Sequence, residues 1–200
     1  MIESIEALRT LYAAPHERAL QKQLAMLEQH SKRFIELAPF VVIASCNRNG
    51  IMDASPRGGD AGFVKVLTDT SIAIPDSPGN NRLDTLTNII ETEQVGLLFM
   101  IPGIDETLRI NGRARLNNDD ALCRLCADQR RTPKLVIEVA IKELYLHCAK
   151  AFMRSALWDA QKHLERSALP SLGKMIGDQL GLAGPAESQE EMVARYQKSL

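Results

Sequence analysis

Residues 55–82 read Ser55-Pro56-Arg57-Gly58-Gly59-Asp60, then Phe63-Val64-Lys65-Val66-Leu67, then Ile72-Ala73-Ile74-Pro75-Asp76-Ser77-Pro78-Gly79-Asn80-Asn81-Arg82. The two apolar runs have the length of strands and are separated by turn residues, so they predict a β-hairpin. Cationic side chains lie at Arg57, Lys65 and Arg82. Guanidinium groups, backbone N–H groups at glycine turns and helix N-termini hold anions such as phosphate. The stretch therefore predicts a hairpin beside a local anion site.

Strand-like segments continue on both sides of this hairpin. Upstream, Phe40–Cys46 is an apolar run, and the turn Asn47-Arg48-Asn49-Gly50 leads to a second strand at residues 51–55. Downstream, residues 95–101, 107–116 and 135–148 are strand-like by apolar content or by alternation. Strands in hairpin order with peripheral helices favour a mainly β fold, a closed antiparallel barrel rather than a sheet built from β-α-β units.

Helices are expected around these strands. Leu20, Leu24 and Leu27 recur at helical spacing and predict an amphipathic helix over residues 16–36. Further signals predict a helix capped by Asn80 or Asn81 with the apolar stripe Leu83, Leu86 and Ile90, a helix over residues 118–130, and a short final helix after the capping box Ser188-Gln189-Glu190-Glu191. Residues 167–185 are rich in Pro and Gly, and we expect them to be irregular apart from one helical turn.

Composition narrows the classes of partner. The formal net charge is −1, from 24 basic and 25 acidic side chains, which argues against general affinity for nucleic acid or membranes. Aromatic residues make up only 4% of the chain, too few for a surface that stacks single-stranded bases. Recognition of an anion must therefore be local.

The cysteines and the N-terminal sequence predict a cytoplasmic protein. No basic segment followed by an apolar one opens the chain, and no run approaches the ~18 apolar residues of a membrane span. Cysteines without an export signal indicate reduced thiols. Cys123 and Cys126 form a CxxC pair without a second pair at zinc spacing, so we expect no metal site.

Five blocks stand in order along the chain: Ser55-Pro56-Arg57-Gly58, residues 74–82, Leu108-Arg109-Ile110-Asn111-Gly112, His147-Cys148-Ala149-Lys150-Ala151 and Arg154-Ser155-Ala156-Leu157-Trp158. Together they resemble the FMN-binding split-barrel family related to pyridoxamine 5′-phosphate oxidase. The resemblance implies a six-stranded antiparallel Greek-key split barrel, FMN as the cofactor, and a homodimer with FMN sites at the interface. We therefore expect the chain to divide into a helical segment at 1–36, the FMN-binding barrel at 37–160, and an extension at 161–200 that packs on the same domain.

The resemblance also implies roles for particular residues. Those expected near the FMN phosphate and ribityl chain are Arg57, Lys65, Asn80, Asn81 and Arg82, and Ser55 is expected among the cofactor-binding residues as well. Those expected against the flavin ring are Pro75, Asp76, Thr107 and Arg109. The second subunit is expected to contribute Lys150, Arg154, Ser155 and Trp158.

The expected activity is that of an FMN-dependent oxidoreductase, with a small organic substrate and electrons from NAD(P)H or a similar donor. The chain ends in Met192-Val193-Ala194-Arg195-Tyr196-Gln197-Lys198-Ser199-Leu200, which lacks the Trp-and-Arg signature of true pyridoxamine phosphate oxidases. No catalytic acid or base stands out. A flavin-binding or sensing protein without turnover is therefore the alternative, and haem or a deazaflavin in the same barrel is a weaker one.

Overall fold

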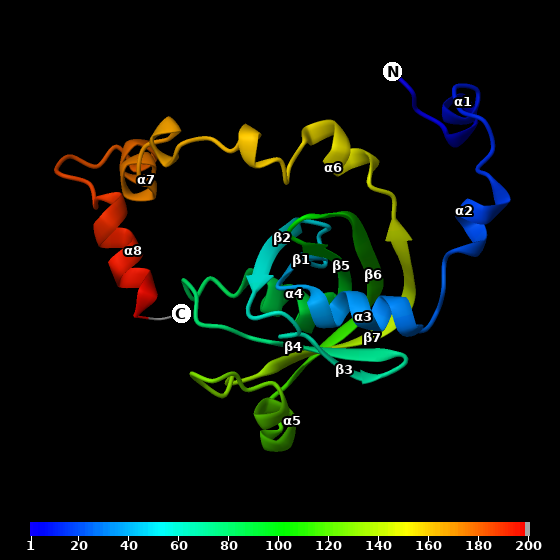
Figure 1. Cartoon of the computed structure of the whole chain (residues 1–200), viewed down its shortest axis with the longest axis horizontal. Helices are drawn as coiled ribbons and strands as arrows, with labels where there is room; N and C mark the ends of the chain where they lie inside the picture. The colour runs from blue at the N-terminus through cyan, green and yellow to red at the C-terminus, as the bar shows by residue number, and fades with distance from the viewer. Residues whose placement is uncertain (199–200) are drawn as a thin grey trace. The chain divides into compact units, whose positions relative to one another are not determined.

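The computed structural model describes residues 1–198 (Figure 1). The chain divides into two compact units, one from Met1 to Trp158 and the other from Asp159 onward. Within the described residues, every helix is too short or too polar to cross a bilayer.

The first unit is built on one antiparallel sheet of seven strands in the order β2-β1-β5-β6-β7-β4-β3. The strands are β1 (Phe40–Cys46), β2 (Met52–Gly58), β3 (Lys65–Thr68), β4 (Ser71–Pro75), β5 (Gln94–Ile101), β6 (Ile104–Asn117) and β7 (Val136–His147). The mainly β split barrel is confirmed, but the expected six strands and full closure are wrong. Among residues 1–198, the edge strands β2 and β3 form no ladder with each other.

Glycines shape the sheet at two places, one in the β1–β2 turn and one in the β6–β7 ladder. Gly50 adopts a φ of +77° in the turn between β1 and β2, as the Asn-Gly pair predicts. The long β6–β7 ladder shifts register between Asn111 and Gly112. A Cβ at Gly112 would collide with the carbonyl oxygen of Ala140, so only glycine fits this close approach of the two backbones.

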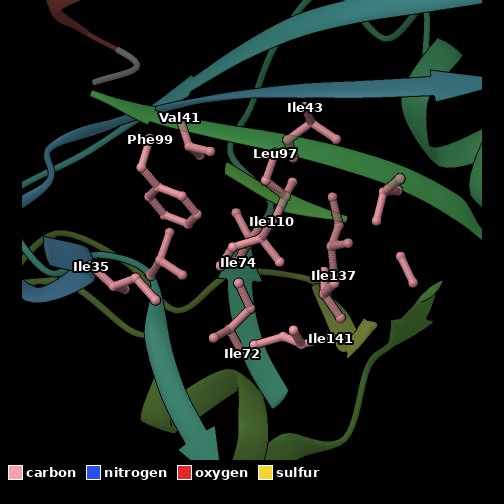
Figure 2. Close-up of a cluster of buried hydrophobic side chains, with 14 of the residues drawn as sticks. Ile35, Val41, Ile43, Ile72, Ile74, Leu97, Phe99, Ile110, Ile137 and Ile141 are labelled. Carbon is pink, nitrogen blue, oxygen red and sulfur yellow. The ribbon is translucent and has the colours of Figure 1, made fainter. Parts of the chain in front are cut away.

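The curled sheet encloses one apolar core. Figure 2 shows Val41, Ile43 and Leu97 of β1 and β5 facing isoleucines of β4 and β7. Helix α3 (Gln29–Leu37) adds Phe34 and Ile35 to the same cluster. Because inward-facing residues alternate with outward ones along each strand, the outer faces remain available for polar side chains.

The expected helix over residues 16–36 is wrong. Two short helices, α1 (Ile5–Arg9) and α2 (Glu17–Gln21), precede α3, and residues 22–28 between α2 and α3 are not helical. Leu24 instead forms an antiparallel β-bridge with Leu144 of β7, with N···O distances of 2.9 and 2.8 Å. This part of β7 lies after Ala140, where the pairing of β7 with β4 ends. The Glu28 carboxylate then caps α3 by accepting from the N–H groups of His30 and Ser31, each at 2.7 Å.

The helix after the Asn pair begins later than the sequence predicts. Helix α4 spans Asp84–Thr92, with Leu83 at its N-cap in place of Asn80 or Asn81. Its buried face is formed by Thr85, Leu86, Asn88 and Ile89, whereas Leu83 and Ile90 of the expected stripe are exposed. Helix α5 (Asp120–Leu125) is shorter than expected, and α6 (Lys150–Ser155) follows β7.

The second unit contains α7 (Leu172–Leu180) and α8 (Gln189–Gln197), preceded by the 3-10 turns η1 (Ala160–Lys162) and η2 (Arg166–Ala168). The capping box of Ser188 and Glu191 is confirmed. Only one helical turn was expected within residues 167–185, whereas α7 is nine residues long. Residues 199 and 200, at the end of the expected 161–200 extension, lie outside the described residues. That this extension packs on the barrel stays a prediction.

Candidate functional site

A cavity of about 770 Å³ lies beside the β2 edge of the sheet. Three chain segments line it: the end of β2, the turn and first residues of α4, and the segment before β7. They contribute Ser55, Pro56, Arg57 and Gly58, then residues 76–86, then Arg131, Thr132, Pro133, Lys134 and Leu135. The anion site expected within residues 55–82 thus gains a third wall from residues far along the chain.

A partly buried polar network fixes α4 against the hairpin of β1 and β2. The Asp53 carboxylate accepts from the Thr85 hydroxyl at 2.5 Å and from the Ser55 hydroxyl at 3.0 Å. Asn88 donates to the Ser45 hydroxyl at 3.0 Å on the neighbouring strand. Because these groups satisfy one another, the start of α4 is held in place at the cavity wall.

The turn before α4 leaves the start of this helix without a side-chain cap. Asn81 and Leu83 adopt φ values of +61° and +60°, in the left-handed region that non-glycine residues seldom occupy. The Asn80 side chain accepts from the Arg82 N–H at 3.0 Å and forms an Asx turn. Leu83 provides no side-chain cap, so the first N–H groups of α4 are open to an anion.

The charges around the cavity are mainly positive. Arg57, Arg82, Arg131 and Lys134 line it, and Arg82 pairs with Asp84 at 2.8 Å. Burial raises the pKa of the Asp76 carboxyl above its usual value, although the charges of Arg57 and Arg131 act in the opposite direction. Asp76 therefore lies within electrostatic range of cations from two walls.

Six of the predicted site residues meet at this cavity: Ser55, Arg57, Asp76, Asn80, Asn81 and Arg82. Lys65 is not among the lining residues. It donates to the Gly62 carbonyl at 2.8 Å, and its charge acts on the Cys126 thiol near α5. Pro75, at the end of β4, is not part of the lining either.

Thr107 and Arg109 lie in a separate polar cluster on the outer face of β6 and β7. Arg109 donates to the Tyr145 hydroxyl at 3.1 Å, and Thr107 is paired in register with His147. The Lys22 ammonium lies 4.9 Å from the centre of the Tyr145 ring, and the His147 ring lies 4.7 Å from it. Burial and the charges of Lys22 and Arg109 lower the pKa of His147.

The four residues expected from a second subunit lie on or just after α6. Trp158 donates its indole N–H to the Ile104 carbonyl at 3.0 Å and stacks at a tilt with Phe152, 5.6 Å between ring centres. The Ser155 hydroxyl donates to the Phe152 carbonyl at 3.0 Å. The side chains of Lys150 and Arg154 are exposed. These contacts hold α6 beside β6, away from the cavity lining.

Sequence reasoning missed Arg131 and Lys134 as cavity residues. Asp128 accepts from the N–H groups of Arg130 and Arg131 at 2.7 and 2.8 Å, and the Asp76 N–H donates to Leu135 at 3.1 Å. The Asp128 bonds shape the segment before β7, and the bond between Asp76 and Leu135 joins it to the end of β4. The run Arg130-Arg131-Thr132-Pro133-Lys134 carries the charge, but only the pairing of β4 with β7 shows where it lies.

Cys123 and Cys126 are buried beside Ala73 and Val136 in a small apolar cluster. Burial is the main cause that raises the pKa of the Cys126 thiol. Across residues 1–198, no three His, Cys, Asp or Glu side chains are placed to hold a metal ion.

The curled antiparallel sheet with its peripheral helices defines a protein of the split-barrel class. The sequence profile described as pyridoxamine 5′-phosphate oxidase matches residues 27–148, more than half of the chain. The chain therefore belongs to the pyridoxamine 5′-phosphate oxidase family, as the five blocks of sequence suggest. A search of curated proteins finds no match.

Two solved structures with a TM-score above 0.5 share the fold at low sequence identity. A variant of HupZ from Group A Streptococcus is 16% identical with a TM-score of 0.51, and the match covers 61% of this chain and all of that chain. Unsubstituted HupZ is 15% identical with a TM-score of 0.51, covering 60% and 94% of the two chains. An FMN-binding protein from Syntrophomonas wolfei is 12% identical with a TM-score of 0.44, covering 72% and 97%.

Proposed function

We propose that this protein binds FMN and that the cavity beside β2 holds the phosphate end of the cofactor. Family membership supports the cofactor, and the observation that carries the placement is the donor set at the start of α4. Arg57 and Arg82 lie in one lining with the uncapped N–H groups of this helix. A phosphate carries roughly −1.5 to −2 charges and several acceptor oxygens, which these donors fit.

The chain's own residues would bind and orient the cofactor. Arg57 supplies a guanidinium from the end of β2, and the Asp53–Thr85 contact keeps the helix N-terminus in place. Asp76 supplies a carboxyl group with a raised pKa at the same cavity. When bound, FMN supplies electron transfer to and from its ring, and the protein sets the orientation and electric field around that ring.

We propose further that the protein is a cytoplasmic homodimer that reduces a small organic substrate with electrons from NAD(P)H or a similar donor. The flavin ring would reach beyond the cavity to Arg109 and to Lys150, Arg154, Ser155 and Trp158 of a second copy. The absence of α6 residues from the cavity lining supports a shared site, since one chain does not bring all these residues into one lining. The free cysteines support a reducing compartment.

A flavin-binding protein without turnover is the second candidate. What favours it is that the sequence shows no catalytic acid or base that stands out. Reduction of the bound flavin by NADH or NADPH, followed by reoxidation by an organic acceptor, would separate the oxidoreductase from this alternative.

An absorption spectrum of the purified protein tests the cofactor. Two flavin bands and the mass of FMN in the released ligand are expected, together with quenching of FMN fluorescence on titration. A Soret band would indicate haem instead. Colourless protein that leaves FMN fluorescence unchanged would overturn the proposal.

A further inference from the structure

Two cysteines lie together at the end of α5. Cys123 and Cys126 are buried and pack in one apolar cluster with Ala73 of β4 and Val136 of β7. Both are free thiols, and the binding of FMN gives neither of them a role. We refer to Cys123 and Cys126 as the buried dithiol.

The spacing of the two cysteines suits a disulfide. Cys123 lies within α5 and Cys126 is its C-cap, with the Cys126 N–H bonded to the Leu122 carbonyl at 3.1 Å. Cα atoms three residues apart in a helix are separated by about 5 Å, inside the roughly 4.4–6.8 Å that a disulfide spans. Because both side chains enter the same cluster, their sulfur atoms lie on one side of the helix. A bond between them closes a small ring at the end of α5.

The surroundings of the buried dithiol favour a disulfide over a metal centre. Over residues 1–198, His, Cys, Asp and Glu side chains form no group of three that could hold a metal ion, whereas a structural zinc site needs four ligands. A disulfide needs only the two sulfur atoms. It also carries no charge, so it can remain in an apolar cluster at no cost in charge burial.

One cation supports reaction at Cys126. Burial raises the pKa of the Cys126 thiol, and the charge of Lys65 acts in the opposite direction. The half-buried Lys65 side chain is held by the Gly62 carbonyl at 2.8 Å. The raised pKa keeps the thiol protonated and reduced at rest, while the neighbouring ammonium stabilises the thiolate, which is the reactive form.

The cover over the buried dithiol is thin. Helix α5 has only six residues, and its Ala121, Arg124 and Leu125 are exposed. A short surface helix opens locally at a lower free energy than the sheet beneath it. A small oxidant can therefore reach the sulfur atoms while the barrel stays folded.

We propose that the buried dithiol is a modification site, at which hydrogen peroxide forms a reversible disulfide between Cys123 and Cys126. The Cys126 thiolate attacks one peroxide oxygen, the O–O bond breaks, and the hydroxide that leaves takes up the thiol proton as water. The Cys123 sulfur then attacks the Cys126 sulfur, the S–O bond breaks, and the hydroxyl group leaves with the Cys123 proton as a second water. Two thiols lose two electrons and two hydrogens, and one peroxide becomes two waters.

The disulfide would form where the third wall of the cavity begins. The chain runs from Cys126 into the segment that carries Arg131 and Lys134, and Val136 of the cluster follows Leu135 of the lining. Neither cysteine lines the cavity, so the modification does not depend on FMN binding there.

Trypsin separates the two cysteines, which gives the disulfide a direct signature. Cleavage after Arg124 leaves Cys123 in the peptide of residues 116–124 and Cys126 in that of residues 125–130, while Cys46 and Cys148 fall in other peptides. The folded, reduced chain would be treated with hydrogen peroxide, alkylated, digested and measured by mass spectrometry. We expect the two peptides to be linked, with the loss of two hydrogens, and to separate again after dithiothreitol.

Lys65→Met should slow the formation of the linked peptides at least about twofold, because it removes the charge that favours the Cys126 thiolate. The matched control is Lys32→Met, which removes an exposed lysine paired with Asp69 and should leave the rate unchanged. Two separately alkylated peptides after peroxide treatment, or sulfinic acid at Cys126 without linkage, would overturn the proposal. So would linkage that appears only in urea-unfolded protein, because the fold would then not bring the thiols together.

Discussion

Arg57 is the residue on which the placement of the FMN phosphate depends most. Its guanidinium lines the cavity beside the uncapped start of α4. Arg57→Ala should weaken FMN binding by roughly 1.5–3 kcal/mol, the range for a hydrogen bond to a charged group. Fluorescence titration with FMN and with riboflavin measures this, because riboflavin lacks the phosphate and its affinity should not change.

The matched control for Arg57 is Arg48→Ala. Arg48 lies in the turn of the same hairpin but contacts Glu91 and is absent from the cavity lining. Equal loss of FMN affinity in both variants would show that general positive charge, rather than a phosphate ligand at Arg57, is responsible.

The ionised Asp76 carboxylate should oppose the binding of an anion in the cavity. The folded protein is more stable when this carboxyl is protonated, because burial disfavours its charged form. Its pKa in the folded protein is raised, mainly by burial, so its contribution to stability is full below its ordinary value of 3.8 and is lost as the pH rises through the folded pKa. Asp76→Asn should therefore gain stability over the unmodified protein between pH 4 and pH 7, as measured by urea unfolding. At pH 7 it should bind FMN more tightly by about 1 kcal/mol, the energy of two charges ~4 Å apart in water.

Asp60→Asn is the control for this change, since Asp60 lies on the neighbouring turn outside the cavity lining. A stability gain that does not grow with pH in Asp76→Asn, or that Asp60→Asn shares, would contradict the assignment of the buried carboxyl.

At the scale of elements, the β6–β7 ladder depends on the glycine at its bulge. A Cβ at Gly112 would meet the Ala140 carbonyl oxygen and lie 3.1 Å from a methyl group of Val139. Gly112→Ala should destabilise the protein by about 1–3 kcal/mol, as overpacking does. Gly177→Ala in α7, where nothing lies within 4 Å, should be neutral or stabilising by up to about 1 kcal/mol. Urea unfolding of both variants compares them directly.

The strands could be predicted from the sequence because their signals are local. Alternation along residues 107–116 and the Asn-Gly turn at Gly50 specify the strands and one hairpin without reference to distant residues. The prediction of a helix over residues 16–36 was wrong because Leu24 pairs with Leu144, which lies more than a hundred residues away in the sequence. Likewise, Leu83 replaces the asparagines at the start of α4, where Asn81 and Leu83 both adopt left-handed backbone, which the sequence does not announce.

The candidate site was predictable only where its residues are close in sequence. Ser55, Arg57 and the Asp76–Arg82 turn belong to neighbouring segments, and the cavity joins them. The pairing of β4 with β7 places Arg131 and Lys134 at the cavity. The bridge between Leu24 and Leu144 places Lys22 beside Tyr145. Such placements follow from tertiary pairing, for which one sequence carries no local signal.

At the scale of the whole molecule, every strand and the main apolar core belong to the unit that ends at Trp158. The cavity and the residues of α6 belong to this unit as well, yet none of the α6 residues is among those that line the cavity. A complete flavin site therefore needs a second copy, if the residues of α6 contact the ring. This is the point on which the homodimer proposal can be tested by complementation.

Two variants, each damaged in a different half of the site, supply that test. Arg57→Ala removes a cavity cation, and Lys150→Ala removes an exposed cation of α6. If the site is shared between subunits, each homodimer is damaged at both sites, whereas the mixed dimer carries one intact site and one doubly damaged site. Coexpressed variants with different affinity tags, purified through both, should recover tight FMN binding at half of the sites, measured by fluorescence titration. Binding no tighter than that of the two parents would place both residues in the same chain's site, and a monomeric mass in sedimentation would exclude the shared site outright.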